Sequence, residues 1–199
     1  MNNVIIQFEK NIERARSFGG LYSALNGLTT PVVDASDMLR YQIVMALSTL
    51  DHYIHELARE GMLEIYAGAR QATPAYNSFQ VSMGIAVSGV NCGGMDWLES
   101  VVRQKHGFLC FQHPDKVADA IRLISEIKLW DVVSVTMGMT ASDLKVRLKL
   151  IVNRRNQIAH EADLDPSFPG QRWSIAPADA TGVIDFIDRL CHEIHTAVV

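Results

Sequence analysis

The feature that most constrains the fold is a long apolar stripe with helical spacing between residues 34 and 61. Its apolar side chains recur at three- and four-residue steps, which places them on one face of an α-helix. No glycine or proline interrupts the segment before Gly61, and Asp34 or Ser36 is expected to cap it, with Asp37 in its first turn. The segment is therefore predicted to be the central helix, with a core face made of Leu39, Ile43, Ala46, Leu47, Leu50, Ile54 and Leu57.

Helical spacing recurs along most of the chain, and the alternating patterns of strands are nearly absent. Pro114 is expected in the first turn of a helix, and Thr140 with Asp143 resembles a capping box that opens another. These patterns predict an all-α fold, an antiparallel helical bundle. Further helices are expected over residues 3–17, 21–28, 95–104, 114–127, 140–160 and 177–197, with a short helix or turn at 130–135.

Two segments are expected to interrupt the bundle. Gly19 and Gly20 should break the first helix, and Thr29 to Pro31 should close the short apolar stretch that follows, which gives two extra N-terminal helices. Residues 68–94 are rich in glycine, serine and asparagine and predict a long inter-helix connection with one short helix near residues 78–85.

Length and composition fit one globular domain over residues 1–199. The formal net charge of −4 argues against broad coating of nucleic acid, although it allows a small basic site on an acidic body. The three cysteines are widely spaced and suit a reducing compartment. The first residues lack the pattern of a secretory signal, and no run approaches the ~18 apolar residues of a membrane span, so we expect a cytoplasmic protein away from membranes.

The segment that carries chemistry is the end of the predicted helix at residues 153–161, which reads NRRNQIAHE. Asn156 and His160 are four residues apart and share a helical face, while Arg155 projects from an adjacent face. A histidine can move a proton near neutral pH, and an arginine can grip phosphate oxygens. An asparagine can hold the imidazole or a phosphate in place. These residue types suit metal-independent cleavage of RNA, in which a 2′-hydroxyl attacks the adjacent phosphorus.

A structural interpretation of the same residues stays open, because cations at the C-terminal end of a helix are favoured by its dipole. One histidine and one arginine also supply only half of a mechanism that moves two protons. Two copies of the segment across a two-fold axis would supply both halves.

The series Arg155-Asn156-x-x-x-His160 resembles the R-N-x-x-x-H signature of the HEPN superfamily, and the longer run from Arg154 to Asp163 most resembles the RiboL-PSP-HEPN branch. Residues 46–56, with Asp51 and a later His-Glu pair, are similar to an early helix of that branch. Residues 111–116 resemble its phenylalanine-glutamine-x-proline turn, and Trp130 lies where a tryptophan precedes the motif helix.

The resemblance covers roughly residues 34–197, which it marks as the HEPN-like core behind an N-terminal extension of residues 1–33. It implies a homodimer whose motifs meet at the interface, an endoribonuclease that leaves cyclic phosphates, and a role in toxin–antitoxin or antiphage systems with an antitoxin or defence partner. Some members bind RNA without cutting it or act in assembly, which is the alternative here. The catalytic residues it implies are Arg155, Asn156, His160 and Asp51.

Two supporting residues have two interpretations each. Asp51 orients His160 or Arg155 across the bundle, with His55 lining the site; alternatively Asp51 satisfies a buried arginine and His55 is a hydrogen-bonded core residue. Arg154 reaches RNA phosphates, or is a solvated neighbour of the motif. No cofactor or metal is expected, because neither His52 with His55 nor the Cys191, His192 and His195 group has an established zinc spacing.

Overall fold

Helix α2 (Asp37–Tyr66) is the axis on which the other long helices pack, as the 34–61 stripe predicts. The computed structural model describes residues 1–28 and 34–199, and within them the chain is all-helical apart from an isolated β-bridge between Leu164 and Arg172. The other helices are α1 (Asn2–Leu28), α3 (Pro74–Asn77), α4 (Met83–Cys92), α5 (Asp96–His106), α6 (Pro114–Arg122), α7 (Leu129–Met137), α8 (Ala141–His160) and α9 (Pro177–Val198).

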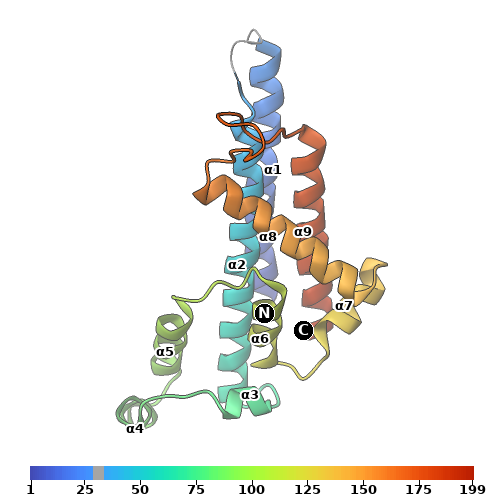
Figure 1. Ribbon diagram of the computed structural model, residues 1–199. Coiled ribbons are helices and arrows are strands. Elements are labelled where there is room, and N and C mark those ends of the chain that lie inside the picture. The colour runs from blue at the N-terminus through green and yellow to red at the C-terminus, as the bar shows by residue number, and fades with distance from the viewer. Residues whose placement is uncertain (29–33) are drawn as a thin grey trace.

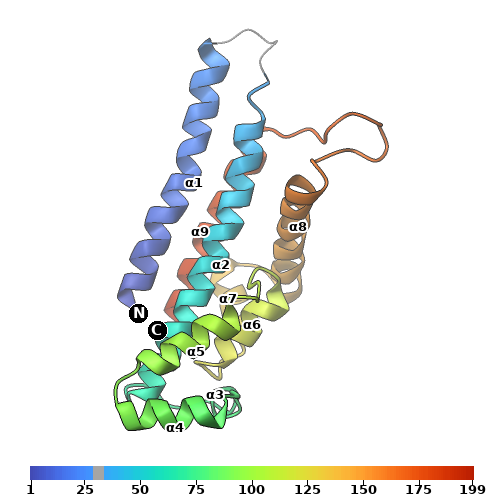
Figure 2. The same ribbon diagram turned by 90° about the vertical axis from the view of Figure 1, so that its left-hand side faces the viewer.

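Three long helices form one side of the bundle. Helix α1 runs antiparallel to α2 and α9, and the N- and C-termini lie close together at one end (Figure 1). Helix α8 lies on the side of α2 away from α1 (Figure 2) and crosses α2 obliquely, with its C-terminal end toward the start of α2 (Figure 1). The short helices α3, α4 and α5 gather at the opposite end of α2 (Figure 2). The C-terminal end of α8, which carries the motif, is thus separated from α1 by the body of the bundle.

Helix α1 is continuous through Gly19 and Gly20, so the predicted break is wrong. Gly19 allows a close approach of α2, since a Cβ atom there would lie 2.9 Å from Nε2 of Gln42. The side-chain amide of Gln42 donates to the carbonyl oxygens of Ala15 and Arg16 at 3.2 and 3.3 Å. A glycine inside a helix costs about 1 kcal/mol, and this packing offsets it. The predicted end at Thr29 to Pro31 lies outside the described residues.

Helix α1 also contributes to the main hydrophobic core and is more than an appendage to residues 34–197. Its buried side chains Val4, Phe8, Ile12 and Ala15 belong to the same cluster as Leu47, Leu50 and Ile54 of α2. The ring of Phe8 lies 5.2 Å from the ring of Tyr53, whose hydroxyl bonds to Nδ1 of His195 at 3.1 Å. Helices α1, α2 and α9 therefore share one core.

Ser36, one of the two expected cap residues, is the N-cap residue of α2, but its side chain makes no capping hydrogen bond. Ser36 has helical backbone angles, so its hydroxyl does not cap the helix and instead accepts a hydrogen bond from Nη1 of Arg40 at 2.5 Å. The carboxylate of Asp34 accepts from the backbone N–H of Ser36 at 2.9 Å. Helix α2 continues past Gly61, where a Cβ atom would lie 2.6 Å from Cγ2 of Ile124.

The connection at residues 68–94 is more ordered than predicted. It holds two helices, α3 with its N-cap Thr73 and α4, which begins five residues later than the short helix expected near residue 78. The hydroxyl of Thr73 accepts from the N–H of Tyr76 and donates to the carbonyl oxygen of Arg122, so this segment is tied to the end of α6.

The predicted starts of three helices are confirmed, whereas α6 ends at Arg122, short of the expected end at residue 127. Pro114 is the first residue of α6, and α9 begins at Pro177. The side chain of Thr140 accepts from the N–H of Asp143 at 3.1 Å, which is the expected cap of α8. None of the described helices has both the length and the apolar character that a membrane span requires.

Candidate functional site

The motif residues lie in the last two turns of α8, where that helix reaches solvent. Its buried face, with Leu144, Leu148 and Ile151, packs on the bundle. Arg155 and Asn156 are half-buried, and His160, the last residue of the helix, is exposed. The helix thus presents the three residues at one end, with the imidazole nearest to solvent.

Arg155 is held by a neutral partner. Its Nη2 donates to Oε1 of Gln112, a residue only 5% exposed, and lies 4.0 Å from Sγ of Cys110. Many arginines of the described chain, Arg154 among them, contact a carboxylate, whereas no carboxylate lies within ion-pair distance of Arg155 in the described ranges. The positive charge of Arg155 is therefore oriented without being neutralised, which suits it for an anionic ligand.

Asp51 supports the segment that holds Arg155. Its Oδ1 accepts a hydrogen bond from the backbone N–H of Phe111 at 2.5 Å. Cys110 lies between the two charged groups: burial and then the charge of Asp51 raise the pKa of its thiol, while Arg155 acts in the opposite direction. Within the described residues Asp51 contacts neither Arg155 nor His160, although one of these contacts was expected. Asp51 acts on Arg155 through the chain segment at Cys110 to Gln112.

His55 lies one turn after Asp51 on α2, with Nε2 3.8 Å from Oδ1 of Asp51. Its ring packs 4.5 Å from the ring of Phe111 and 6.3 Å from that of His106. His52, His55 and His106 line a cavity together with Asp51. His55 is thus joined to the motif by Phe111, which follows Cys110.

Arg154 points away from Arg155 and into an ion cluster. Its Nη1 and Nη2 contact both oxygens of Asp163, the second at 3.0 Å, and Asp163 also accepts from Nε of Arg40 at 2.6 Å. Asp163 is 1% exposed. Arg154 is therefore not a solvated neighbour of the motif; both of its amino groups are engaged by a buried carboxylate.

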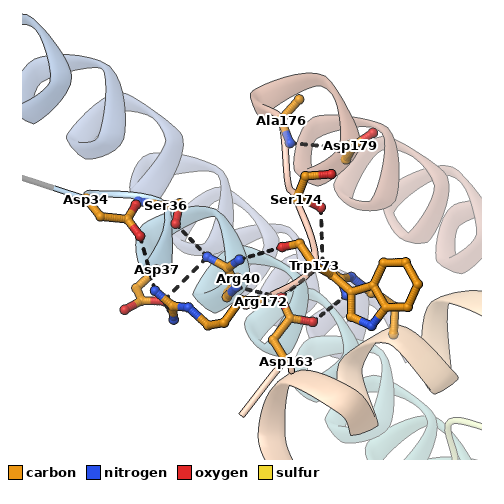
Figure 3. Close-up of polar contacts among 11 residues, drawn as sticks. Asp34, Ser36, Asp37, Arg40, Asp163, Arg172, Trp173, Ser174, Ala176 and Asp179 are labelled. Carbon is orange, nitrogen blue, oxygen red and sulfur yellow. Dashed lines mark hydrogen bonds and ion pairs between the residues drawn. The ribbon is translucent and has the colours of Figure 1, made fainter. Parts of the chain in front are cut away.

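The ion cluster fixes the chain that leaves His160. Ala162 and Asp163 have positive φ angles of 52° and 57°, which reverse the chain, and the N–H of Asp163 donates to the carbonyl oxygen of Gln157 at 3.0 Å. Figure 3 shows Arg40 beside Asp163 and Trp173, whose carbonyl oxygen accepts from Nη2 of Arg40 at 2.7 Å. The loop after α8 is thus fastened to the start of α2.

An outer layer of the same network involves Arg172. Its guanidinium contacts the carboxylates of Asp34 and Asp37 at the start of α2 (Figure 3). These groups are largely exposed, so the pairs contribute little to stability.

Sequence reasoning missed three residues that the structure places at the site. Gln112 and Cys110 contact Arg155, and His106 lies behind Phe111. Only Gln112 had a signal: it is the glutamine of the phenylalanine-glutamine-x-proline turn that residues 111–116 resemble, just before Pro114. The described part of the chain contains no group of three His, Cys, Asp or Glu side chains arranged to hold a metal ion.

Comparison of the chain with protein-family models, with curated proteins and with solved structures finds no significant match. The resemblance to the HEPN superfamily therefore stays a prediction, and the function has to be argued from the site itself.

Proposed function

We propose that the chain is a metal-independent endoribonuclease that uses the end of α8. The observation that carries this proposal is the state of Arg155, a cation held in place by the neutral side chain of Gln112 and left without a carboxylate partner among the described residues. Five residues later on the same helix end lies His160, an exposed imidazole. A fixed cation and a titratable group at one helix end are the two kinds of group that cleavage of a phosphodiester uses.

The roles follow from chemistry. His160 takes the proton from a 2′-hydroxyl or gives one to the leaving 5′-oxygen, so that a 2′,3′-cyclic phosphate and a free 5′-hydroxyl form. Arg155 stabilises the extra negative charge of the phosphorane. Asn156 shares the helical face of His160 and positions the phosphate or the imidazole. Asp51 acts indirectly, by holding the N–H of Phe111 next to Gln112.

The second half of the proton transfer would come from a second copy of the chain. Exposed apolar side chains flank the motif and favour self-association: Leu150 is 62% exposed one turn before the motif, and Phe108 is 91% exposed on the loop that holds Arg155. Val146, one turn before Leu150 on α8, is also exposed. A homodimer packed on this surface would bring two α8 ends together.

A role as a toxin or antiphage effector, with an antitoxin or defence protein as partner, is part of the same proposal and rests on the resemblance to the HEPN superfamily alone. A chain that binds RNA without cutting it is the competing outcome.

The test is incubation of purified protein with total RNA and a labelled tRNA pool in EDTA, beside His160→Ala and the control His113→Ala. His113 precedes α6, and its imidazole lies within ion-pair distance of Asp115. We expect cyclic-phosphate ends from the parent and the His113 variant and none from the His160 variant. Equal cleavage by all three would refute the assignment of His160. Tight RNA binding without cleavage by the parent would replace the nuclease by a binding module.

A further inference from the structure

A cavity of about 410 Å³ lies between α2 and α5, next to the loop that holds Arg155. Its walls include Asp51 and His55 from α2, Val102 and His106 from α5, and Leu109 from the following loop. The volume falls in the range of small-ligand sites. Nothing in the proposed cleavage at the α8 end requires this cavity.

His106, on the wall of the cavity, is buried and carries a ring nitrogen that is unpaired within the described ranges. It is 5% exposed, and its Nδ1 atom has no hydrogen-bond partner among the described residues. Leaving a buried polar atom unpaired costs roughly 1–3 kcal/mol, so such an atom is explained by a ligand or a water that pairs with it. Burial first, and then the nearby His55, lower the pKa of His106 to about 4, so the ring is neutral at pH 7. A neutral imidazole nitrogen can accept or donate one hydrogen bond.

Three imidazole rings line the cavity, those of His52, His55 and His106, and two phenylalanine rings pack behind them. The ring of His55 lies 4.5 Å from that of Phe111, and His106 is edge-on to Phe111 at 5.4 Å and to Phe79 at 5.9 Å. Rings in these arrangements offer faces and edges on which a planar heteroaromatic group can pack.

The charges of the cavity are balanced, which favours a neutral ligand. Glu56 pairs with Arg59 at 2.7 Å and with Arg103 at 3.1 Å, and Arg59 also contacts Glu99. Asp51 accepts the N–H of Phe111. An anionic or cationic ligand would have to compete with these pairs.

Consecutive residues connect this cavity to the motif. Leu109 lines the cavity, Cys110 lies 4.0 Å from Arg155, Phe111 donates to Asp51, and Gln112 accepts from Arg155. A phosphate at Arg155 would therefore lie against the same chain segment that forms one wall of the cavity.

We propose that the cavity lined by Asp51, His55, His106 and Leu109 is a subsite for one nucleobase of RNA whose neighbouring phosphate is held at Arg155. The site pairs the base edge with His106 and packs its face against the ring of His55, which Phe111 supports from behind. This inference rests on the proposed function, since it is the RNA at Arg155 that delivers the base.

The test uses protein with ¹³C-labelled histidine and follows the ring signals by NMR. One arm titrates the four ribonucleoside monophosphates singly, and the other titrates short 2′-O-methyl RNAs, which cannot be cleaved by 2′-hydroxyl attack. We expect saturable shifts of His55 and His106 with RNA and selectivity for one base, with His192, between α1 and α9, as the unmoved reference. Ser48→Trp, which fills the cavity from an exposed position, should abolish the shifts.

The outcomes separate this inference from the proposed function. RNA that shifts His160 but leaves His55 and His106 unmoved overturns the subsite and leaves the nuclease standing. Monophosphates that shift His55 and His106, in a protein that cleaves no RNA, support base recognition and overturn the nuclease. No response to any nucleotide means that water alone occupies the cavity, which also overturns the subsite. In a cleaving protein, Ser48→Trp should lower the preference for the flanking base by about tenfold.

Discussion

Arg155 on α8 donates a hydrogen bond to the side-chain carbonyl oxygen of Gln112, the last residue but one before α6. The contact joins the end of the motif helix to a loop that Asp51 of α2 also holds, through the N–H of Phe111. The orientation of the Arg155 guanidinium thus depends on α8, on the loop before α6 and on α2. A substitution in the loop or in α2 can disturb Arg155 without replacing it.

Replacing Gln112 tests whether this orientation matters. Gln112→Leu removes the acceptor, and because a hydrogen bond to a charged group is worth about 1.5–3 kcal/mol, RNA cleavage should fall about 10- to 100-fold. Gln112→Glu keeps an acceptor but neutralises Arg155 and should weaken RNA binding instead. Initial rates and RNA affinity, measured beside melting temperatures, distinguish the two. A Leu variant that cleaves at the parental rate would show that Gln112 plays no part.

The buried carboxylate of Asp163 should dominate the stability of the loop after α8. Asp163→Asn keeps a residue that tolerates a positive φ, but among the described residues it leaves Arg154 without a carboxylate partner and leaves the buried Arg40 only the exposed Asp37 at 3.6 Å. Removing one partner of a buried pair costs about 3–5 kcal/mol, so urea unfolding should show a loss of that size. Arg172→Ala, which removes exposed pairs with Asp34 and Asp37, is the control and should cost less than about 1 kcal/mol. Similar small losses in both variants would contradict this account.

These residues show what the sequence could predict. The stripe of α2, the cap at Thr140 and the proline at the start of α6 depend on local spacing and are read directly. The continuity of α1 could not be read, because Gly19 is tolerated only through its close approach to Gln42 of α2.

The candidate site also has one part that the sequence could predict and one that it could not. The motif places Asn156 and His160 on one helical face by spacing alone. The engagement of Arg154 by Asp163, and of Arg155 by Gln112, depends on contacts between segments that spacing does not reveal. Adjacent arginines thus have opposite surroundings, one neutralised and one not.

His192 should make the attachment of α1 depend on pH. Its Nε2 lies 3.2 Å from Oε1 of Glu9 on α1, and its Nδ1 bonds to the carbonyl oxygen of Asp188. Burial lowers the pKa of His192, but the bonds to Asp188 and Glu9 outweigh it and raise the pKa above 6.5. A raised pKa stabilises the folded state fully below about pH 6.5, and that contribution is lost as pH rises through the folded value. The difference in unfolding free energy between the parent and His192→Gln should therefore shrink from pH 6 to pH 8; a constant difference would contradict it.

His106 should lower the stability of the fold at acid pH, which is the opposite of the effect of His192. Burial and then His55 lower the pKa of His106 to about 4. Between about pH 6.5 and pH 4, His106 therefore binds a proton in the unfolded chain but stays neutral in the folded chain. The contribution of neutral His106 to the free energy of unfolding is complete above pH 6.5. It falls as the pH drops, by roughly 3 kcal/mol for a pKa shift of this size. In His106→Phe this part of the acid-induced loss should vanish, as followed by urea unfolding at pH 4.5 and 7. An unchanged loss would assign it to other groups.

Leu150 should be part of the surface that joins two copies of the chain. It is 62% exposed on α8, one turn before the motif, so Leu150→Glu adds a charge to the proposed interface without disturbing the core. Sedimentation should show a shift from dimer to monomer, and RNA cleavage should fall with the dimer fraction because each site needs both copies. Val87→Glu on α4, where Val87 is 54% exposed, matches the change in charge and exposure away from the motif and should leave mass and cleavage unchanged. If the Leu150 variant cleaves RNA as a monomer at the parental rate, one α8 end is sufficient, and a second proton-transfer group must then lie within the same chain.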